Sequence, residues 1–157
     1  MKELILKSTI SVVQMSELSD EERSLVEQAI EATNRSYAPY SHFHVGAALR
    51  LRNGATFIGC NQENAAFPAG LCAERTALFA AGANYPEEPV CMLAIAARDA
   101  QGELLEEPVS PCGTCRQVLI ETEKRFHHAV HILLYGKRHT YIVEGIGQLM
   151  PLSFSEF

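Results

Sequence analysis

Three cysteines in two short segments constrain most strongly how this chain can fold. Cys72 lies in Cys-Ala-Glu-Arg, and 40 residues later Cys112 and Cys115 lie in Pro-Cys-Gly-Thr-Cys-Arg. A Cys-x-x-Cys pair at the start of a helix can direct both sulfurs at one zinc ion. Helices are predicted to begin at both segments, where the macrodipole and free N–H groups stabilise thiolates. The fold must therefore bring two helix N-termini together, and three thiolates leave open the fourth position that a catalytic zinc site needs.

The amino-acid composition limits which kinds of molecule the protein is expected to bind. The 157 residues are enough for one domain, and 47% hydrophobic with 20% charged residues is typical of globular proteins. A net charge of −6 without a Lys/Arg cluster speaks against a nucleic-acid partner. We therefore expect a small, weakly charged substrate.

The five cysteines also bear on compartment. Their odd number, together with the lack of a recognisable signal peptide, argues against a disulfide framework and favours a cytoplasmic protein. No apolar run approaches the roughly 20 residues of a membrane span, so we expect no membrane association.

Capping, turn-forming and helix-breaking residues indicate where the helices and strands begin and end. Ser19 and Glu22 form a capping-box pattern that begins a helix, and Pro39 prevents its continuation. Asn53-Gly54 between two strand-like runs predicts a β-hairpin. Two further helices are expected at residues 72–83, which look buried on all sides, and 112–126. Five strands are expected, at residues 45–51, 55–60, 92–97, 130–135 and 140–143.

The connection between the last two strands decides their relative direction. Residues 136–139 are too few for a parallel crossover, so these strands must be antiparallel. The order of elements predicts an α/β fold with helices packed on a mixed five-stranded sheet. Residues 19–157 would form this single domain, with residues 1–18 as an N-terminal extension.

Several of these segments together resemble a known protein family. Cys72-x-Glu74 combined with Pro111-Cys-x-x-Cys is the known signature of zinc deaminases. Over residues 22–154 the chain resembles the small, homotetrameric cytidine deaminases. The matching segments are Tyr-Ser-His-Phe at 40–43, Val-Gly-Ala-Ala-Leu at 45–49, Gly-Cys-Asn-Gln-Glu-Asn-Ala at 59–65, Cys-Ala-Glu-Arg-Thr-Ala at 72–77 and Pro-Cys-Gly-Thr-Cys-Arg-Gln at 111–117.

The resemblance implies a three-layer α/β/α sandwich and a role for each matched residue. Cys72, Cys112 and Cys115 would hold Zn²⁺, which lowers the pKa of a water molecule. Glu74 would accept that proton and return it to N3 and the leaving amine of the pyrimidine after hydroxide attacks C4. The implied substrate-binding residues are Phe43 stacking on the base, the backbone around Ala73 reading it, Asn61 and Glu63 holding the ribose, and Phe67 and Phe154 completing the sites of neighbouring subunits.

The implied function is hydrolysis of cytidine and 2′-deoxycytidine in pyrimidine salvage by a homotetramer with shared active sites. Two residues depart from the family pattern: Phe67 replaces a common tyrosine, and His44 replaces a common proline, which is expected to loosen that turn. Arg75 would offset the negative charge of three thiolates.

Other interpretations remain open at this point. The chain could be a deaminase of another cytosine- or blasticidin-type substrate, a structural-zinc module without turnover, or a thiol oxidoreductase that uses Cys112 and Cys115. Cys60 and Cys91 are expected in the core. His127, His128 and His131 surround a predicted helix end, and we expect no metal there.

Overall fold

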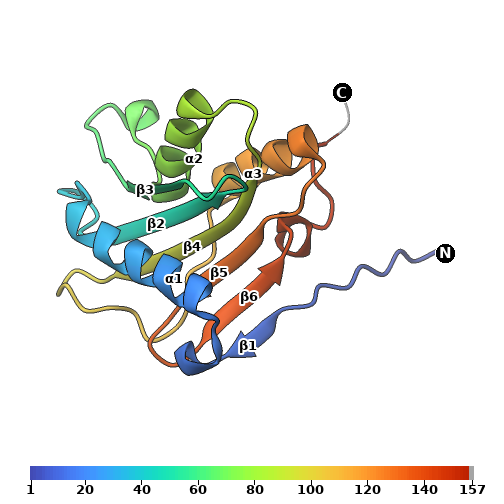
Figure 1. Ribbon diagram of the computed structural model, residues 1–157, viewed down its shortest axis with the longest axis horizontal. Coiled ribbons are helices and arrows are strands. Elements are labelled where there is room, and N and C mark those ends of the chain that lie inside the picture. The colour runs from blue at the N-terminus through green and yellow to red at the C-terminus, as the bar shows by residue number, and fades with distance from the viewer. Residues whose placement is uncertain (156–157) are drawn as a thin grey trace.

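The computed structural model describes residues 1–155, in which three helices accompany a six-stranded sheet (Figure 1). The helices are α1 (Asp20–Ala32), α2 (Ala73–Asn84) and α3 (Gly113–Phe126). The strands are β1 (Ser11–Val13), β2 (His44–Leu51), β3 (Thr56–Cys60), β4 (Val90–Arg98), β5 (His131–Tyr135) and β6 (Thr140–Glu144). Short 3-10 turns are η1 (Met15–Glu17), η2 (Thr33–Arg35), η3 (Phe67–Ala69) and η4 (Ile146–Leu149).

The sheet has the order β1-β6-β5-β4-β2-β3, and β4–β5 is its one parallel pair within the described residues. The predicted antiparallel pairing of β5 with β6 is confirmed by the register Tyr135↔Thr140 across their short link. The expected count of five strands is wrong. The sixth strand is β1, which pairs with β6 from Ser11↔Ile142 to Val13↔Thr140 and so covers an edge that would otherwise present unpaired backbone groups.

Helices cover both faces of the sheet, which confirms the α/β/α sandwich (Figure 1). Alternate residues of a strand point to opposite faces. Along β2, Ala47 and Leu49 pack into the core under α2 and α3, whereas Ala48 packs into the core under α1. Both cysteine-bearing helices therefore lie on the same face.

The capping box at the start of α1 is confirmed. The hydroxyl of Ser19 accepts a hydrogen bond from the Glu22 N–H at 3.3 Å, and the Ser19 N–H donates to the Glu22 carboxylate at 2.8 Å. Buried Leu25, Val26 and Ala29 then attach α1 to its face of the sheet.

Gly59 in β3 lets α2 approach the sheet closely. A Cβ atom at this position would lie 2.3 Å from the Ala73 carbonyl oxygen and 2.5 Å from the Ala77 nitrogen, closer than real contacts allow. The N-terminal turn of α2 therefore rests directly on backbone, which fixes where Cys72 and Glu74 lie.

The expectation that the second helix is buried on all sides is wrong. Phe79 on α2 is 50% exposed and borders a groove of about 380 Å³ together with Leu78 and Phe126. The helix has one sheet to pack against, so its opposite side faces outward in the single chain.

Cys60 and Cys91 are half-buried and belong to neither core cluster, so their expected place in the core is wrong. The Cys60 thiol instead donates a hydrogen bond to the Arg35 carbonyl at 3.2 Å. All five cysteines lie in the described residues, and none forms a disulfide. Among residues 1–155 we find no helical segment with the length and hydrophobicity that a bilayer crossing requires.

Candidate active site

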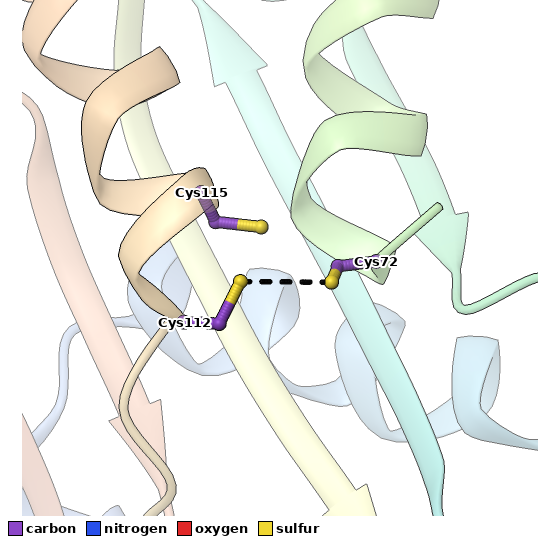
Figure 2. A group of neighbouring side chains, drawn as sticks. All are labelled: Cys72, Cys112 and Cys115. Atoms are coloured by element: carbon purple, nitrogen blue, oxygen red, sulfur yellow. Dashed lines mark hydrogen bonds between the residues drawn. The ribbon is translucent and has the colours of Figure 1, made fainter. Parts of the chain in front are cut away.

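Three thiols converge where α2 and α3 begin (Figure 2). Cys72 is the N-cap of α2, Cys112 is the N-cap of α3, and Cys115 lies in the first turn of α3. Their sulfur atoms are all within 4.8 Å of one another, and those of Cys72 and Cys112 are 3.7 Å apart. Thiolates that share one tetrahedral zinc at about 2.3 Å lie about 3.8 Å from each other, so the donor set and its spacing fit this ion.

The electrostatics of the site favour a thiolate at Cys72. A hydrogen bond with Cys115 and the nearby Arg75 guanidinium, whose Nη2 is 3.7 Å from the sulfur, lower the pKa of Cys72 to about 5. The same hydrogen bond and burial raise the pKa of Cys115. Three thiolates around a divalent ion would carry one excess negative charge, and the Arg75 guanidinium lies next to the Cys72 sulfur where that charge would be.

Glu74 lies next to this cluster in the first turn of α2 and is 4% exposed. Burial raises the pKa of its carboxyl group, and the charge of the Cys72 thiolate raises it further. A raised pKa makes this carboxyl group a better proton acceptor when it is ionised, as general acid–base catalysis requires.

A cavity of about 550 Å³ opens beside the thiols. It brings together three of the predicted substrate-binding residues, Asn61, Glu63 and Phe67, with Cys72 and Arg75. Its volume is within the range of about 300–1,000 Å³ that small-molecule sites occupy. The remaining predicted residues are not among those that line it in the described part of the chain: Phe43, Ala73, Glu74, Cys112, Cys115 and Phe154.

Asn61 uses both ends of its carboxamide on backbone groups. Its Oδ1 accepts from the Val45 N–H at 2.8 Å, and its Nδ2 donates to the Phe43 carbonyl at 2.8 Å. These bonds continue the β2–β3 ladder beyond Cys60 and hold the residues that follow the Phe43 turn.

Glu63 is hydrogen-bonded to Tyr40 and Ser41, which line the same cavity. Its Oε2 accepts from the N–H groups of Tyr40 at 2.8 Å and Ser41 at 3.2 Å, and its Oε1 accepts from the Ser41 hydroxyl. These donors, chiefly the hydroxyl, lower the pKa of Glu63, so the carboxylate is ionised.

The predicted aromatic residues lie on separate elements and face outward. Phe67 begins η3 and is 94% exposed, and Phe154 is 66% exposed in the segment after η4. The Phe154 carbonyl accepts from Gln117 Nε2 at 2.8 Å, which attaches this segment to α3. His44 is anchored by its Nδ1, 2.6 Å from the Ser36 hydroxyl, at the start of β2.

Three residues that help to build the site were not predicted from the sequence. Arg116 donates from Nε to the Pro111 carbonyl at 2.8 Å and from Nη1 to the Leu149 carbonyl at 2.6 Å, which holds the loop before Cys112. The Thr76 hydroxyl lies 3.0 Å from the Cys72 carbonyl and 3.2 Å from the Cys60 carbonyl, so it links the start of α2 to β3. Ser41 anchors Glu63. All three lie within the segments that match the family motifs, and this match was the sequence feature that could have identified them.

Comparison with known proteins places this arrangement in a family. Residues 19–130 match the family described as "Cytidine and deoxycytidylate deaminase zinc-binding region". The chain belongs to the cytidine and deoxycytidylate deaminase family. This deaminase is 36% identical over 129 residues to the cytidine deaminase of Mycobacterium tuberculosis, an alignment that covers 80% of this chain and 84% of that protein. It is 42% identical over 97 residues to the cytidine deaminase of Halalkalibacterium halodurans, covering 62% of this chain and 68% of that protein.

Solved structures agree with the sequence relatives. The crystal structure of cytidine deaminase from Burkholderia pseudomallei superimposes on this deaminase with a TM-score of 0.72 at 37% identity, covering 87% of this chain and all of that one (100%). The fold and the family's zinc-binding region therefore support zinc as the ion for the three-thiol cluster.

Proposed function

We propose that this deaminase hydrolyses cytidine and 2′-deoxycytidine to uridine and 2′-deoxyuridine plus ammonia, with Zn²⁺ as cofactor. The observation that carries the proposal is the convergence of three thiols from two helix N-termini beside the buried carboxyl group of Glu74. Among residues 1–155 the cluster of candidate ligand atoms comprises these three thiols, which suits a catalytic site with an open position better than a closed structural site.

Bound zinc supplies Lewis-acid activation of a water molecule at neutral pH. In the proposed reaction Glu74 takes one proton from water and delivers it to N3 of the pyrimidine. The same carboxyl group then passes the second proton to the exocyclic nitrogen, which leaves as ammonia while C4 keeps the oxygen. Its burial excludes bulk water from this transfer.

Other residues in and around the cavity would bind and orient the nucleoside. Asn61 and Glu63 lie in the cavity and would hold the ribose hydroxyl groups, and Phe43 on the adjoining turn would stack on the base. The N–H groups at the first turn of α2, around Ala73, have no partner within a helix and would read the polar edge of the base. Arg75 would keep the thiolate of Cys72 charged.

We further propose a homotetramer in which neighbouring subunits share sites. Phe67 and Phe154 support this, because both aromatic side chains are largely exposed in the single chain and a neighbouring subunit would cover them. The unpaired cysteines suit the reducing cytoplasm, where the reaction would serve pyrimidine salvage. Residues 19–157 would act as one catalytic domain and residues 1–18 as an extension that reaches the sheet through β1.

A turnover assay with metal analysis tests the function. Purified protein should contain about one zinc per chain and should convert cytidine with a loss of ultraviolet absorbance that a chelator abolishes. A Cys72→Ala variant should lose both zinc and turnover. A Cys91→Ala variant, altered at a thiol outside the cluster, should keep both.

Other outcomes would identify the rival functions. Zinc without turnover of cytidine or deoxycytidine would indicate a structural-zinc module or a deaminase for a different substrate. Thiol-dependent redox activity that is indifferent to zinc would indicate an oxidoreductase.

A further inference from the structure

The turn formed by residues 40–43 at the cavity mouth has an unusual backbone conformation. His42 has a φ of 53°, in the left-handed region that residues other than glycine rarely adopt. A residue persists in this conformation when surrounding interactions hold it. The bonds around the turn therefore show what fixes the position of Phe43.

One hydroxyl group links both sides of this turn. Ser41 Oγ donates to Glu63 Oε1, and the same oxygen accepts from the Phe43 N–H at 3.1 Å. Glu63 Oε2 meanwhile accepts the N–H groups of Tyr40 and Ser41, so the carboxylate spans the turn before His42. Ser41 is the residue through which Glu63 and the backbone of Phe43 are connected.

We propose that Ser41 is a positioning residue that sets the distance between the Glu63 carboxylate and the Phe43 ring. The inference rests on the proposed function, in which Glu63 holds the ribose and Phe43 stacks on the base of the same nucleoside. A nucleoside fits both contacts at once when the separation between them is fixed. The hydrogen bonds of Ser41 go to Glu63 and to the Phe43 backbone and not to a thiol or to Glu74, so its effect is on substrate binding and not on the chemical step.

Steady-state kinetics of Ser41→Ala test this role. We expect KM for cytidine to rise about ten-fold, the cost of losing one hydrogen bond to a charged group, while kcat changes less than about three-fold. Zinc content should stay at the wild-type level. Ser41→Thr, which keeps the hydroxyl, should restore KM to within about three-fold of wild type.

Ser19→Ala is the matched control, because Ser19 forms the same kind of Ser–Glu hydrogen-bond pair at the start of α1. It should lower the melting temperature and leave KM unchanged. A merely structural role for Ser41 predicts the same pattern for Ser41→Ala, and that pattern would overturn the proposal.

A double-mutant cycle asks whether Ser41 acts through Glu63. In a Glu63→Ala background the Ser41→Ala change should raise KM by less than about two-fold, because the link it breaks is already gone. A full ten-fold rise in that background would overturn the inference.

A reporter that needs no substrate separates this proposal from the proposed function. The chain has no tryptophan, so Phe43→Trp provides a single indole on the turn. Its fluorescence anisotropy should fall when Ser41→Ala is added, and an unchanged anisotropy would overturn the positioning role even if cytidine is turned over. Absence of turnover in zinc-loaded wild type would instead overturn the proposed function, and with it the KM part of the inference.

Discussion

Glu74 and Glu63 are two carboxyl groups at one site whose surroundings differ. Glu74 is buried beside a thiolate, which favours its protonated form, whereas Glu63 accepts three hydrogen bonds, which favour its charged form. Such a separation of environments is how one site supports a proton carrier and a fixed anionic contact. The two residues therefore suit different tasks, proton transfer for Glu74 and sugar binding for Glu63.

Replacement of Glu74 by glutamine should abolish most of the activity. The amide has nearly the same shape but cannot carry the proton, so we expect kcat to fall by about 10²–10⁴-fold with zinc content unchanged. Kinetics combined with metal analysis measure both effects. Turnover close to wild type in a zinc-loaded Glu74→Gln protein would rule out the proton-transfer role.

The convergence of the three thiols could be predicted from sequence, whereas the partners of Glu63 could not. Cys112 and Cys115 lie one helical turn apart, so their spacing alone directs both sulfurs to one point. The contact between Glu63 and Ser41 joins residues 22 positions apart through a turn whose shape depends on a left-handed His42. No local pattern predicts that conformation for a histidine.

At the level of single elements, the position of α2 depends on Gly59 in β3 having no side chain. Gly59→Ala would place a methyl group 2.3 Å from the Ala73 carbonyl and must push the N-terminus of α2 outward. We expect a loss of about 1–3 kcal/mol in unfolding free energy, as for other overpacked contacts, and weaker zinc binding because Cys72 moves. Denaturant unfolding and competition with a zinc chelator measure these changes.

Gly82→Ala is the control for this prediction. Gly82 lies in the same helix, and a Cβ there meets nothing within 4 Å. Alanine should stabilise the helix by about 0.5–1 kcal/mol and leave zinc affinity unchanged. If both glycine variants have the same effect, close packing of α2 on β3 does not position the metal site.

The start of α1 should make stability depend on pH in the acid range. Although burial raises it, hydrogen bonds from Ser19 and His131 bring the pKa of Glu22 below its ordinary value of 4.5. A carboxyl group with a lowered pKa stabilises the fold above its unfolded pKa, and this contribution disappears as pH falls through the folded pKa. Glutamine keeps an oxygen for the Ser19 N–H but loses the negative charge at the helix start beside His131. Glu22→Gln should therefore cost about 0.3–1 kcal/mol at pH 7, and progressively less below pH ~4.5.

Unfolding curves of metal-free protein at several pH values measure this effect. Glu27→Gln, at an exposed position of the same helix, should show no such dependence. A deficit for Glu22→Gln that does not shrink as the pH falls below ~4.5 would contradict an electrostatic origin, because protonation of Glu22 removes the charge that glutamine lacks.

Element boundaries were predictable where local chemistry determines them. Asn53-Gly54 demands a tight turn, and Gly54 indeed has a φ of 87° between β2 and β3. The three residues of β1 carry no such signal. They are a strand because β6 offers an open edge, and that edge exists only after the whole sheet has formed.

For the whole molecule, shared active sites predict rescue between two defective variants. If Phe154 of one subunit completes the site of its neighbour, Glu74→Gln and Phe154→Ala should each be poorly active alone. Mixed oligomers produced by co-expression should regain activity, because sites with an intact Glu74 then receive an intact Phe154. Up to about a quarter of wild-type activity is expected for equal random mixing of two chains per shared site.

Analytical ultracentrifugation of the same preparations reports the assembly. A mass of four chains together with recovered activity supports the shared tetramer. Full activity in a monomer, or mixed oligomers that stay as inactive as their parents, would contradict it.

The layered architecture could be predicted from the order of helices and strands, but the exposed side of α2 could not. Residues 72–83 carry apolar side chains all round and so looked buried on every side, whereas Phe79 on α2 is exposed because the helix packs on the sheet with one side only. Hydrophobic periodicity identifies buried surface without saying by what it is buried.

The side-chain carboxamide of Asn61 makes the hydrogen bonds that a backbone peptide group would make in a β-ladder. Its oxygen accepts from the Val45 N–H and its nitrogen donates to the Phe43 carbonyl. Attempts to evolve this enzyme toward other sugars by randomising position 61 would thus mostly yield proteins with a frayed hairpin end and a misplaced aromatic ring. Libraries at Phe67, which lines the cavity and is exposed in the single chain, leave this hairpin end intact and are the more promising route to altered nucleoside preference.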